Sequence, residues 1–268
     1  MKKIKSINPI LIFCMLFMWG CTNDLNTEPK GQDISEDQLL ELQPNLDGLV
    51  SKVYGTFALS GASGPGSTDT PGDDAGESPF LRGIINLQDF VADDMKNRWG
   101  DGGLDPLTTA SNWDENNKFM KYLYNRVYYT VPQCNKVINQ LSQYNIPTRE
   151  QVKSELRFLR ALAYYYLIDC FGKGPILTEA DAENSGPKPE ASREQLFNFV
   201  VSELLDIENK LPSRIGYGRT NKHVVQMLLA KMYLNSEVYT GVARYDKALE
   251  YSQKVIDQGG YQLATNFV

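Results

Sequence analysis

The fold of this chain is decided by residues 155–172, which read ELRFLRALAYYYLIDCFG. The segment is almost entirely apolar except for two arginines near its start, Arg157 and Arg160. Side chains three or four positions apart share one face of a helix, so both arginines lie on the face that carries Ala161 and Tyr164. A buried helix does not tolerate guanidinium groups without partners. We therefore expect a central packing helix whose arginines pair with carboxylates of a neighbouring helix.

Helical periodicity on both sides of this segment predicts an all-α protein. Apolar residues recur at helical spacing over residues 35–57, where Pro44 implies a kink, and again over residues 81–95. Residues 116–260 are expected to pack as antiparallel helices with no sheet. Pro132 should bend or divide the first of these helices.

Two capping boxes mark helix starts in the second part of the chain. Thr148 is followed three positions later by Gln151, and Ser192 is followed by Gln195. In this pattern each side chain bonds the backbone N–H of the other residue, which satisfies two free donors of the first turn. The glycines and proline of residues 172–175, GKGP, end the arginine-bearing helix.

The helices carry a repeated signature in which a small residue is followed three positions later by tyrosine. It occurs as Ala161 with Tyr164 and as Ala230 with Tyr233. A small residue lets paired helices approach, and the tyrosine fills the space beside it, which is typical of tetratricopeptide repeats. Tyr245 lies six residues later than a standard repeat would place it. The expected fold is therefore a set of degenerate tetratricopeptide-like helical repeats with long irregular loops.

A long loop is predicted over residues 60–79, which are rich in glycine, proline and serine. Its acidic residues, Asp69, Asp73, Asp74 and Glu77, do not follow the spacing of a calcium-binding loop. We expect a solvated loop without a metal ion.

The N-terminus predicts export and lipid attachment. Lysines at positions 2, 3 and 5 precede an apolar run over residues 10–19, and Gly20 and Cys21 follow it. A membrane-spanning helix needs about 20 apolar residues, so the shorter run indicates a signal peptide. A small residue before cysteine is typical of lipoprotein processing, in which the thiol of Cys21 is acylated; an ordinary signal peptide cut elsewhere is the alternative. The predicted organisation is a lipoprotein signal peptide over residues 1–20, a tether over 21–34 and a folded domain over 35–268.

The charge excludes nucleic acid as a partner. The chain carries 27 Lys and Arg against 33 Asp and Glu, a net charge of −6. Removal of the signal peptide takes away three lysines and leaves a net charge of −9. A protein this acidic repels phosphate backbones.

Cys134 and Cys170 are expected to be two free, buried thiols. They lie on helices that should form an antiparallel hairpin turning near residue 146, 12 residues before and 24 residues after the turn. The mismatch is about 18 Å along a helix axis, whereas a disulfide needs Cα atoms within about 7 Å.

The sequence contains no recognisable catalytic motif. Its one histidine, His223, lies near the start of a helix and is expected to be a surface or capping residue. Zinc, phosphate-loop and dinucleotide-binding patterns are missing from the sequence, and we expect neither a cofactor nor an enzyme. A hydrolase stays a rival hypothesis because a glycosidase pair of carboxylates is defined by geometry.

Several stretches resemble the SusD/RagB family. They are residues 128–138, 155–175, 218–234 and 245–263. Members of this family are surface lipoproteins of Bacteroidetes-type bacteria that capture glycans for a TonB-dependent transporter. The resemblance implies a glycan ligand, a SusC-like transporter as partner, and a lipid anchor that holds the protein at the outer membrane and cell surface. Family members run on beyond residue 268 through a loop-rich half, so the chain resembles an N-terminal portion.

The candidate ligand residues lie in loops. Capture of a sugar requires aromatic faces for its C–H surfaces and short polar groups for its hydroxyls. Residues 97–103, NRWGDGG, offer Trp99 between Arg98 and Asp101, and glycines hold the loop open. Trp113, between an asparagine and an aspartate, is the second candidate. We expect all four side chains to contribute to glycan binding; anchoring of the loop onto the helices is the alternative role of either tryptophan.

Two functions follow from these patterns. The favoured hypothesis is a cell-surface lipoprotein that captures an oligo- or polysaccharide and delivers it to a TonB-dependent transporter. The alternative is a lipid-anchored tetratricopeptide-like scaffold that binds protein and has no affinity for glycans. An aromatic cluster on the loop side would favour the first, and a concave groove lined by helices would favour the second.

Replacement of Cys21 by alanine should release the protein from membranes into the soluble fraction, because the acylated thiol is its predicted anchor. Membrane partitioning and incorporation of labelled fatty acid measure the effect. A Cys21→Ala variant that still partitions with membranes and takes up label would contradict the lipoprotein hypothesis.

Overall fold

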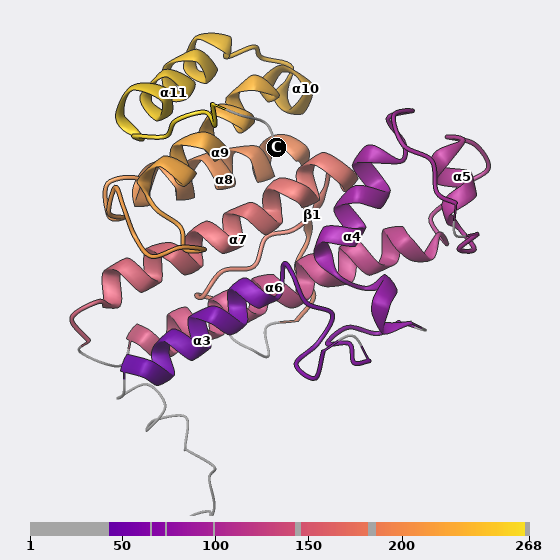
Figure 1. Ribbon diagram of the computed structural model, residues 1–268, viewed down its shortest axis with the longest axis horizontal. Coiled ribbons are helices and arrows are strands. Elements are labelled where there is room, and N and C mark those ends of the chain that lie inside the picture. Colours follow the sequence, from indigo (N-terminus) through magenta and orange to yellow (C-terminus); the bar gives the residue numbers. More distant parts are fainter. Residues whose placement is uncertain are drawn as a thin grey trace, which may run out of the picture. The chain divides into compact units, whose positions relative to one another are not determined.

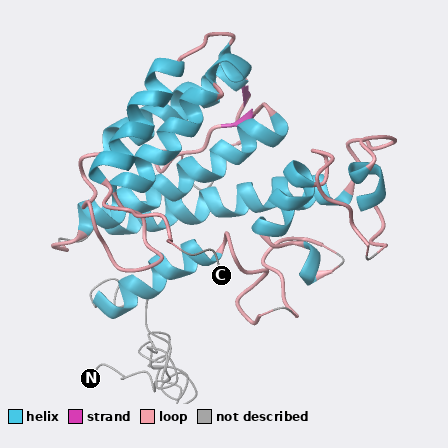
Figure 2. Cartoon of the chain, turned by 45° about the horizontal axis from the view of Figure 1, so that its top comes forward, coloured by secondary structure: helices cyan, strands magenta, loops and turns pink. Residues whose placement is uncertain are grey.

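The computed structural model describes residues 43–64, 66–72, 74–98, 100–142, 146–181 and 186–265. The described part is almost entirely helical, as expected (Figures 1 and 2). Its α-helices are α3 (Gln43–Gly55), α4 (Phe80–Ile84), α5 (Leu104–Thr108), α6 (Lys118–Ser142), α7 (Arg149–Phe171), α8 (Arg193–Ile207), α9 (Lys222–Leu234), α10 (Ser236–Thr240) and α11 (Tyr245–Gln258). A 3₁₀ turn, η2 (Ala75–Glu77), and a π-helical turn, η3 (Ile85–Asp89), complete the helical elements.

The arginine-bearing helix α7 lies at the centre of the helical stack. It packs against α6 on one side and α8 on the other, α8 packs on α9, and α9 packs on α11 (Figure 1). This succession of adjacent helices confirms the tetratricopeptide-like arrangement. One continuous core fills the stack, and α7 contributes Leu156, Leu159, Ala161, Ala163, Tyr164, Leu167 and Ile168 to it.

The two arginines of α7 pair with carboxylates of α8, which confirms the expectation. Arg157 Nη2 lies 2.6 Å from Glu203 Oε1, and Arg160 Nη2 lies 2.5 Å from Glu203 Oε2. Arg157 also pairs with Asp206, and Arg160 with Glu179 of the loop after α7. Burial lowers the pKa of Arg160, but the charge and hydrogen bond of Glu203 outweigh it, so the pKa is raised. Both guanidinium groups therefore stay charged inside the stack.

Among the described residues of 116–260, one short sheet interrupts the helices, and it lies in the connection after α7. β1 (Gly174–Pro175) and β2 (Glu190–Ala191) form a two-stranded antiparallel pair, so the expectation of no sheet over residues 116–260 was wrong. A Cβ at Gly174 would lie 2.4 Å from Tyr128 Oη, and Tyr128 Oη donates to Pro175 O at 3.0 Å. Glycine at this position thus lets the strand approach α6.

Of the two capping boxes predicted from the sequence, the one at the start of α8 is confirmed and the one at the start of α7 was wrong. Ser192 and Gln195 form a complete capping box at the start of α8. The side chain of Thr148 makes no capping hydrogen bond, because its backbone (φ −91°, ψ 6°) lacks the extended conformation that a cap requires. Gln151 instead donates to Glu155 Oε1 at 3.2 Å.

Helix lengths also differ from the sequence expectations. Pro132 lies inside α6 without dividing it, and the helix expected over 81–95 breaks into α4 and η3 and ends at Asp89. Neither α5 nor η2 was anticipated, and α10 occupies the turn that is too long for a standard repeat. Of the helix expected over 35–57, the described part is α3. The predicted signal peptide over 1–20, Cys21 and the whole tether over 21–34 lie outside the described residues. Among the described residues no helix is both long and apolar enough to cross a bilayer.

The two described cysteines are free, as expected. Cys134 is buried, whereas Cys170 is only partly buried, so the prediction of two buried thiols holds for the first alone. Burial raises the pKa of each thiol to about 12.

Replacement of Arg160 by methionine should lower the free energy of unfolding by about 3 kcal/mol, because Glu203 loses one of its two arginines and Asn135 and Glu179 lose their buried guanidinium partner. Chemical denaturation monitored by circular dichroism measures the change. Lys210→Met is the control, since Lys210 pairs with Asp206 on the surface at 2.7 Å and should contribute less than about 1 kcal/mol. Equal effects of the two substitutions would contradict a central role for the buried pair.

Candidate functional site

A pocket of about 450 Å³ lies beside α6, and six of its ten lining residues are apolar: Ala58, Pro79, Leu81, Ile85, Phe90 and Leu104. Most of its lining residues come from α4, η3 and the loop that leads to α5. The lining side chains that can contact a polar ligand or its apolar face are Arg82, Asn86, Phe90, Asn97 and Asp101.

Close packing on α6 fixes the position of α4 and η3. Gly83 faces α6, where an added Cβ would lie 3.1 Å from the side chain of Leu123. Phe80 is fully buried in the main core. A smaller apolar cluster, which includes Leu104 and Phe119, supports the opposite wall of the pocket. The pocket is therefore built on rigid packing although loops form much of its rim.

Arg82 joins the two loops that border the pocket. Its Nη1 donates to Gly76 O at 3.0 Å, and its Nη2 lies 2.7 Å from Asp101 Oδ2. The guanidinium carbon lies 5.7 Å from the centre of the Phe119 ring. The side chains of Arg82 and Asp101 are 33% and 28% exposed, so the pair keeps donors and an acceptor within reach of solvent and of a ligand.

A second ion pair holds the neighbouring loop. Lys118 Nζ lies 2.7 Å from both carboxylate oxygens of Glu77, and it also lies over the Phe119 ring at 5.1 Å. Burial lowers the pKa of Lys118, but the hydrogen bond and charge of Glu77 outweigh it and raise the pKa. Asp74 accepts from the backbone N–H of Gly76 at 2.7 Å. The described carboxylates of the 60–79 loop thus serve its own structure, and the described residues contain no cluster of three potential metal ligands.

Arg126 of α6 fixes the loop over residues 60–79 to the helix. It is fully buried, its Nε donates to Ser78 O at 2.6 Å, and its Nη2 donates to Ser78 Oγ at 3.0 Å and to Ser60 O. Burial lowers its pKa, while Asp69, with an oxygen 3.9 Å away, acts in the opposite direction. One side chain therefore ties both ends of the loop to the helix.

The structure brings one of the four predicted glycan residues into this pocket. Asp101 lines it, whereas Arg98 is exposed and does not. Trp99 lies outside the described residues, between Arg98 and Gly100. Trp113 is 50% exposed and is not part of the lining.

Three of these lining residues were missed in the sequence, Arg82, Asn86 and Phe90, whereas Asn97 lies in the predicted loop. Asn86 is three residues after Gly83 and four before Phe90, so it falls on the inner face of a helical segment. A polar residue on that face was the signal that would have found it. Arg82 carries no such signal, because its partners Gly76 and Asp101 lie six and 19 residues away, beyond the three- or four-residue spacing of helix neighbours.

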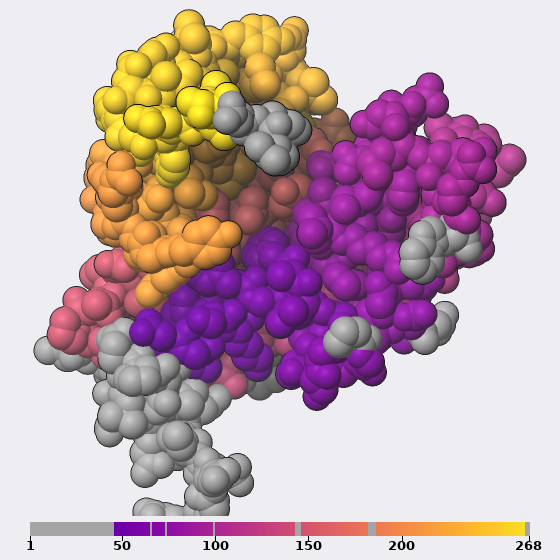
Figure 3. Space-filling view, in the orientation of Figure 1, coloured from indigo at the N-terminus to yellow at the C-terminus, as the bar shows by residue number. Residues whose placement is uncertain are grey.

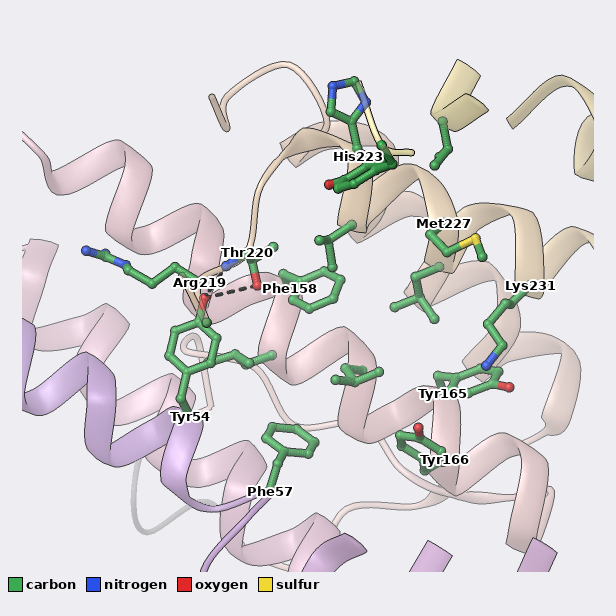
Figure 4. Close-up of a pocket in the computed structure, with 17 residues that line it drawn as sticks. Tyr54, Phe57, Phe158, Tyr165, Tyr166, Arg219, Thr220, His223, Met227 and Lys231 are labelled. Atoms are coloured by element: carbon green, nitrogen blue, oxygen red, sulfur yellow. Dashed lines mark hydrogen bonds between the residues drawn. The ribbon is translucent and has the colours of Figure 1, made fainter. Parts of the chain in front are cut away.

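A second, larger hollow of about 620 Å³ lies between α3, α7 and α9. The space-filling view shows this face hollowed between the indigo residues of α3 and the orange residues of α9 (Figure 3). Figure 4 shows Phe57, Phe158, Tyr165, Tyr166 and Met227 gathered around it.

The polar groups at the edge of this hollow are largely bound within the protein. Tyr54 Oη accepts from the backbone N–H of Thr220 at 2.8 Å and lies 3.0 Å from Glu155 Oε2, and burial raises its pKa to about 12. Arg219 donates to both oxygens of Glu155 at 2.8 and 2.9 Å. The hollow is therefore suited to apolar groups more than to sugar hydroxyls.

His223 borders the same hollow and is 3% exposed, so the expectation of a surface residue was wrong. The cap of α9 is Asn221, whose side chain accepts from the backbone of His223 and Val224. The ring Nδ1 of His223 lies 2.9 Å from Gln226 Oε1, which fixes the ring inside the fold.

With this geometry in place, comparison with known proteins assigns the class. The chain belongs to the SusD-like family: the family model described as "Starch-binding associating with outer membrane" matches residues 33–234. It is 32% identical over 253 residues to the starch-binding protein SusD of Bacteroides thetaiotaomicron, covering 92% of this chain and 44% of that protein. The chain thus spans less than half the length of this relative.

Solved structures share the fold. A SusD superfamily protein of Parabacteroides distasonis superposes with a TM-score of 0.67 at 19% identity, over 84% of this chain and 46% of that one. A laminarin-binding SusD-like protein superposes with a TM-score of 0.65 at 18% identity, over 84% and 47% of the two chains. At these identities the likeness establishes the architecture alone.

Replacement of Arg126 by methionine should loosen the loop beside the pocket, because the carbonyl oxygens of Ser60 and Ser78 lose their buried donor. A lost buried hydrogen bond of this kind costs about 1–3 kcal/mol, so amides of residues 66–72 and 74–78 should exchange roughly tenfold faster or more. Hydrogen exchange measured by mass spectrometry tests this. Lys121→Met, on the exposed face of the same helix, should leave the exchange unchanged; unchanged exchange in the Arg126 variant would show that the loop is held by other contacts.

Proposed function

We propose that this protein binds a glycan at the pocket formed by α4, η3 and the loop over residues 97–103. The observation that carries the proposal is the partly exposed Arg82–Asp101 pair at the rim of a pocket that also presents the Phe90 ring. Charged donors and acceptors bind hydroxyls, and an aromatic face packs against the C–H surface of a pyranose. Trp99 lies two residues before Asp101 and adds an aromatic side chain to the same loop.

Membership of the family supports this assignment. Its model is described as starch-binding, and the SusD of Bacteroides thetaiotaomicron is named a starch-binding protein. Since the chain covers under half of that relative, the identity of the glycan and the full set of contacts belong to the proposal.

We further propose that the protein works at the cell surface. A signal peptide over residues 1–20, an acylated Cys21 and a tether over residues 21–34 would hold the domain at the outer membrane. From there it would pass its glycan to a SusC-like TonB-dependent transporter. The short apolar run before Gly20 and Cys21 and the family's description as associating with the outer membrane support this location.

Binding without catalysis fits the pocket. Asp101 is the carboxylate in the described lining, and it is engaged by Arg82 at 2.7 Å. Glu77, on the neighbouring loop, is engaged by Lys118. Glycosidases use two carboxylates placed about 5–9.5 Å apart on either side of the bond that they cleave. Carboxylates held in ion pairs, as Asp101 and Glu77 are, fit a binding role better than a catalytic one: they fix the loops of the pocket wall and can accept hydrogen bonds from sugar hydroxyls.

The larger apolar hollow favours the alternative function, a scaffold that binds protein. Its helix-borne aromatic residues, among them Phe57, Phe158 and Tyr166, suit an apolar protein segment. The exposed Arg82–Asp101 pair of the smaller pocket and the family nevertheless support glycan capture as the primary function.

Replacement of Trp99 by alanine in the full-length mature protein should weaken glycan binding about tenfold, because loss of one stacking aromatic costs on the order of 1–2 kcal/mol. Isothermal calorimetry or affinity electrophoresis against a panel of polysaccharides measures the effect. Trp113→Ala is the matched control, since Trp113 does not line the pocket.

Unchanged affinity in the Trp99 variant would assign that residue to loop anchoring. A larger loss in the Trp113 variant would move the binding surface to its segment. Wild-type protein that binds no polysaccharide of the panel, but binds a purified transporter, would favour the scaffold function.

A further inference from the structure

The larger hollow carries three polar side chains at one end, where they form a cluster. Lys231 of α9 and Tyr165 and Tyr166 of α7 all line the hollow. Figure 4 shows Lys231 reaching from α9 toward the ring of Tyr165, with Tyr166 beside it. Lys231 Nζ lies 5.5 Å from the centre of the Tyr165 ring, and the two tyrosine rings pack edge to face with their centres 5.0 Å apart. We refer to these three residues as the Lys231 cluster.

The charge of Lys231 has no counterion among the described residues. Its side chain contacts the Tyr165 ring and forms no ion pair with them. Asp169 lies one turn beyond Tyr165 on α7, but its carboxylate already accepts hydrogen bonds. The donors are Tyr239 Oη and Gln88 Nε2, each at 2.6 Å. An ammonium group without an anion at the wall of an apolar hollow attracts a negatively charged ligand.

The hydroxyl groups of Tyr165 and Tyr166 are unpaired as well. Neither forms a hydrogen bond with a described residue. Tyr165 is 5% exposed, yet neither oxygen is among the described polar atoms that are unpartnered and also sealed from solvent, so a small molecule can reach both. Burial raises the pKa of both hydroxyls. Each therefore keeps its proton at neutral pH and can donate a hydrogen bond to an anion.

An apolar surface leads away from the Lys231 cluster. His223, Met227 and Lys231 follow one another at four-residue spacing, so they lie along one face of α9 over about 12 Å. On the other side, α7 presents Phe158 and Leu162 to the hollow. A volume of about 620 Å³ has room for a small molecule with an apolar body. The hollow thus combines an apolar surface with a cation and two hydroxyl donors at one end.

We propose that the larger hollow binds an amphipathic carboxylate, an apolar chain that ends in a single carboxylate group, as in the anion of a fatty acid. The carboxylate pairs with Lys231 Nζ and accepts a hydrogen bond from Tyr165 or Tyr166. The apolar chain runs along α9 toward His223. This site is separate from the glycan pocket, and the inference does not rest on the proposed function.

Charge complementarity determines both the class of ligand and its direction. Arg219, on the loop before α9, already donates to both oxygens of Glu155. Lys231 has no such partner among the described residues, so the carboxylate belongs at its end of the hollow. A charge-assisted hydrogen bond is about twice as strong as a neutral one. A neutral apolar segment or an uncharged sugar would leave this ammonium group without an anion.

The test compares decanoate with decan-1-ol, which has the same chain without the charge, by calorimetry on the full-length mature protein. We expect the wild type to bind decanoate about tenfold more tightly, because only the carboxylate pairs with Lys231. Lys231→Met should remove this preference, since methionine keeps an apolar stem and loses the charge. Its affinity for decan-1-ol should stay within about twofold of wild type.

Lys222→Met is the matched control on the same helix. Lys222 Nζ donates to Asn209 Oδ1 at 2.9 Å and does not line the hollow, so this substitution should change neither affinity. Tyr165→Phe keeps the ring and removes an unpaired hydroxyl, so it should weaken decanoate binding while the Tm stays the same or rises. Met227→Glu places a negative charge along the path of the chain and should weaken binding of both ligands.

Three outcomes would overturn the inference. A wild type that binds decan-1-ol as tightly as decanoate would show that the charge of Lys231 has no part in binding. Equal affinities for decanoate in the Lys231 and Lys222 variants would show the same. A wild type that binds neither ligand would leave the hollow to an apolar protein segment. Affinity for polysaccharides should be unchanged in all these variants, so failure of this inference would leave the proposed function in place.

Discussion

The fold depends on the ion pairs that two arginines of α7 make inside the helical stack. Arg160 is 1% exposed and bonds Glu203 of α8, Glu179 of the following loop and Asn135 of α6. Buried charges are costly unless paired, so these groups are stable only when three separate segments meet around them. The network therefore does more than hold two helices together. It requires one arrangement of α6, α7 and α8, and it ties the long loop after α7 to that arrangement.

A second buried arginine performs the same task at the other end of α6. Arg126 uses backbone carbonyls and a serine hydroxyl where Arg160 uses carboxylates, and it organises a loop rich in glycine and proline. Such a loop has little apolar surface to bury and pays a high conformational entropy on ordering. A fully buried donor with several N–H groups compensates by bonding two points of the loop at once. The helical stack thereby extends its rigidity to the wall of the smaller pocket, which Ala58 and Pro79 at the two ends of this loop help to line.

The two hollows of the domain differ in how their polar groups are used. Around the larger one, Tyr54, Arg219 and Glu155 satisfy one another, which leaves an apolar surface. In the smaller one, the carboxylate of the Arg82–Asp101 pair is 28% exposed, whereas Glu155 of the larger hollow is fully buried. An exposed carboxylate can accept from sugar hydroxyls, whereas a buried one cannot. This difference, more than volume, separates a glycan site from a surface suited to apolar protein segments.

The sequence by itself determined the helical stack, the pairing of Arg157 and Arg160 with a neighbouring helix, and the cap at Ser192, because these follow from local periodicity and from the cost of burying charge. The residues that resemble the SusD/RagB family indicated a glycan-binding class, and the match of the family model confirms that the chain belongs to the SusD-like family. Tertiary structure decided which carboxylates meet the arginines and which polar side chains share the pocket. Thr148 fails as a cap because its backbone is not extended (φ −91°, ψ 6°). Asn86 and Asp101 line one pocket because α4 and η3 pack on α6, and packing between separate segments leaves no periodic signal in the sequence.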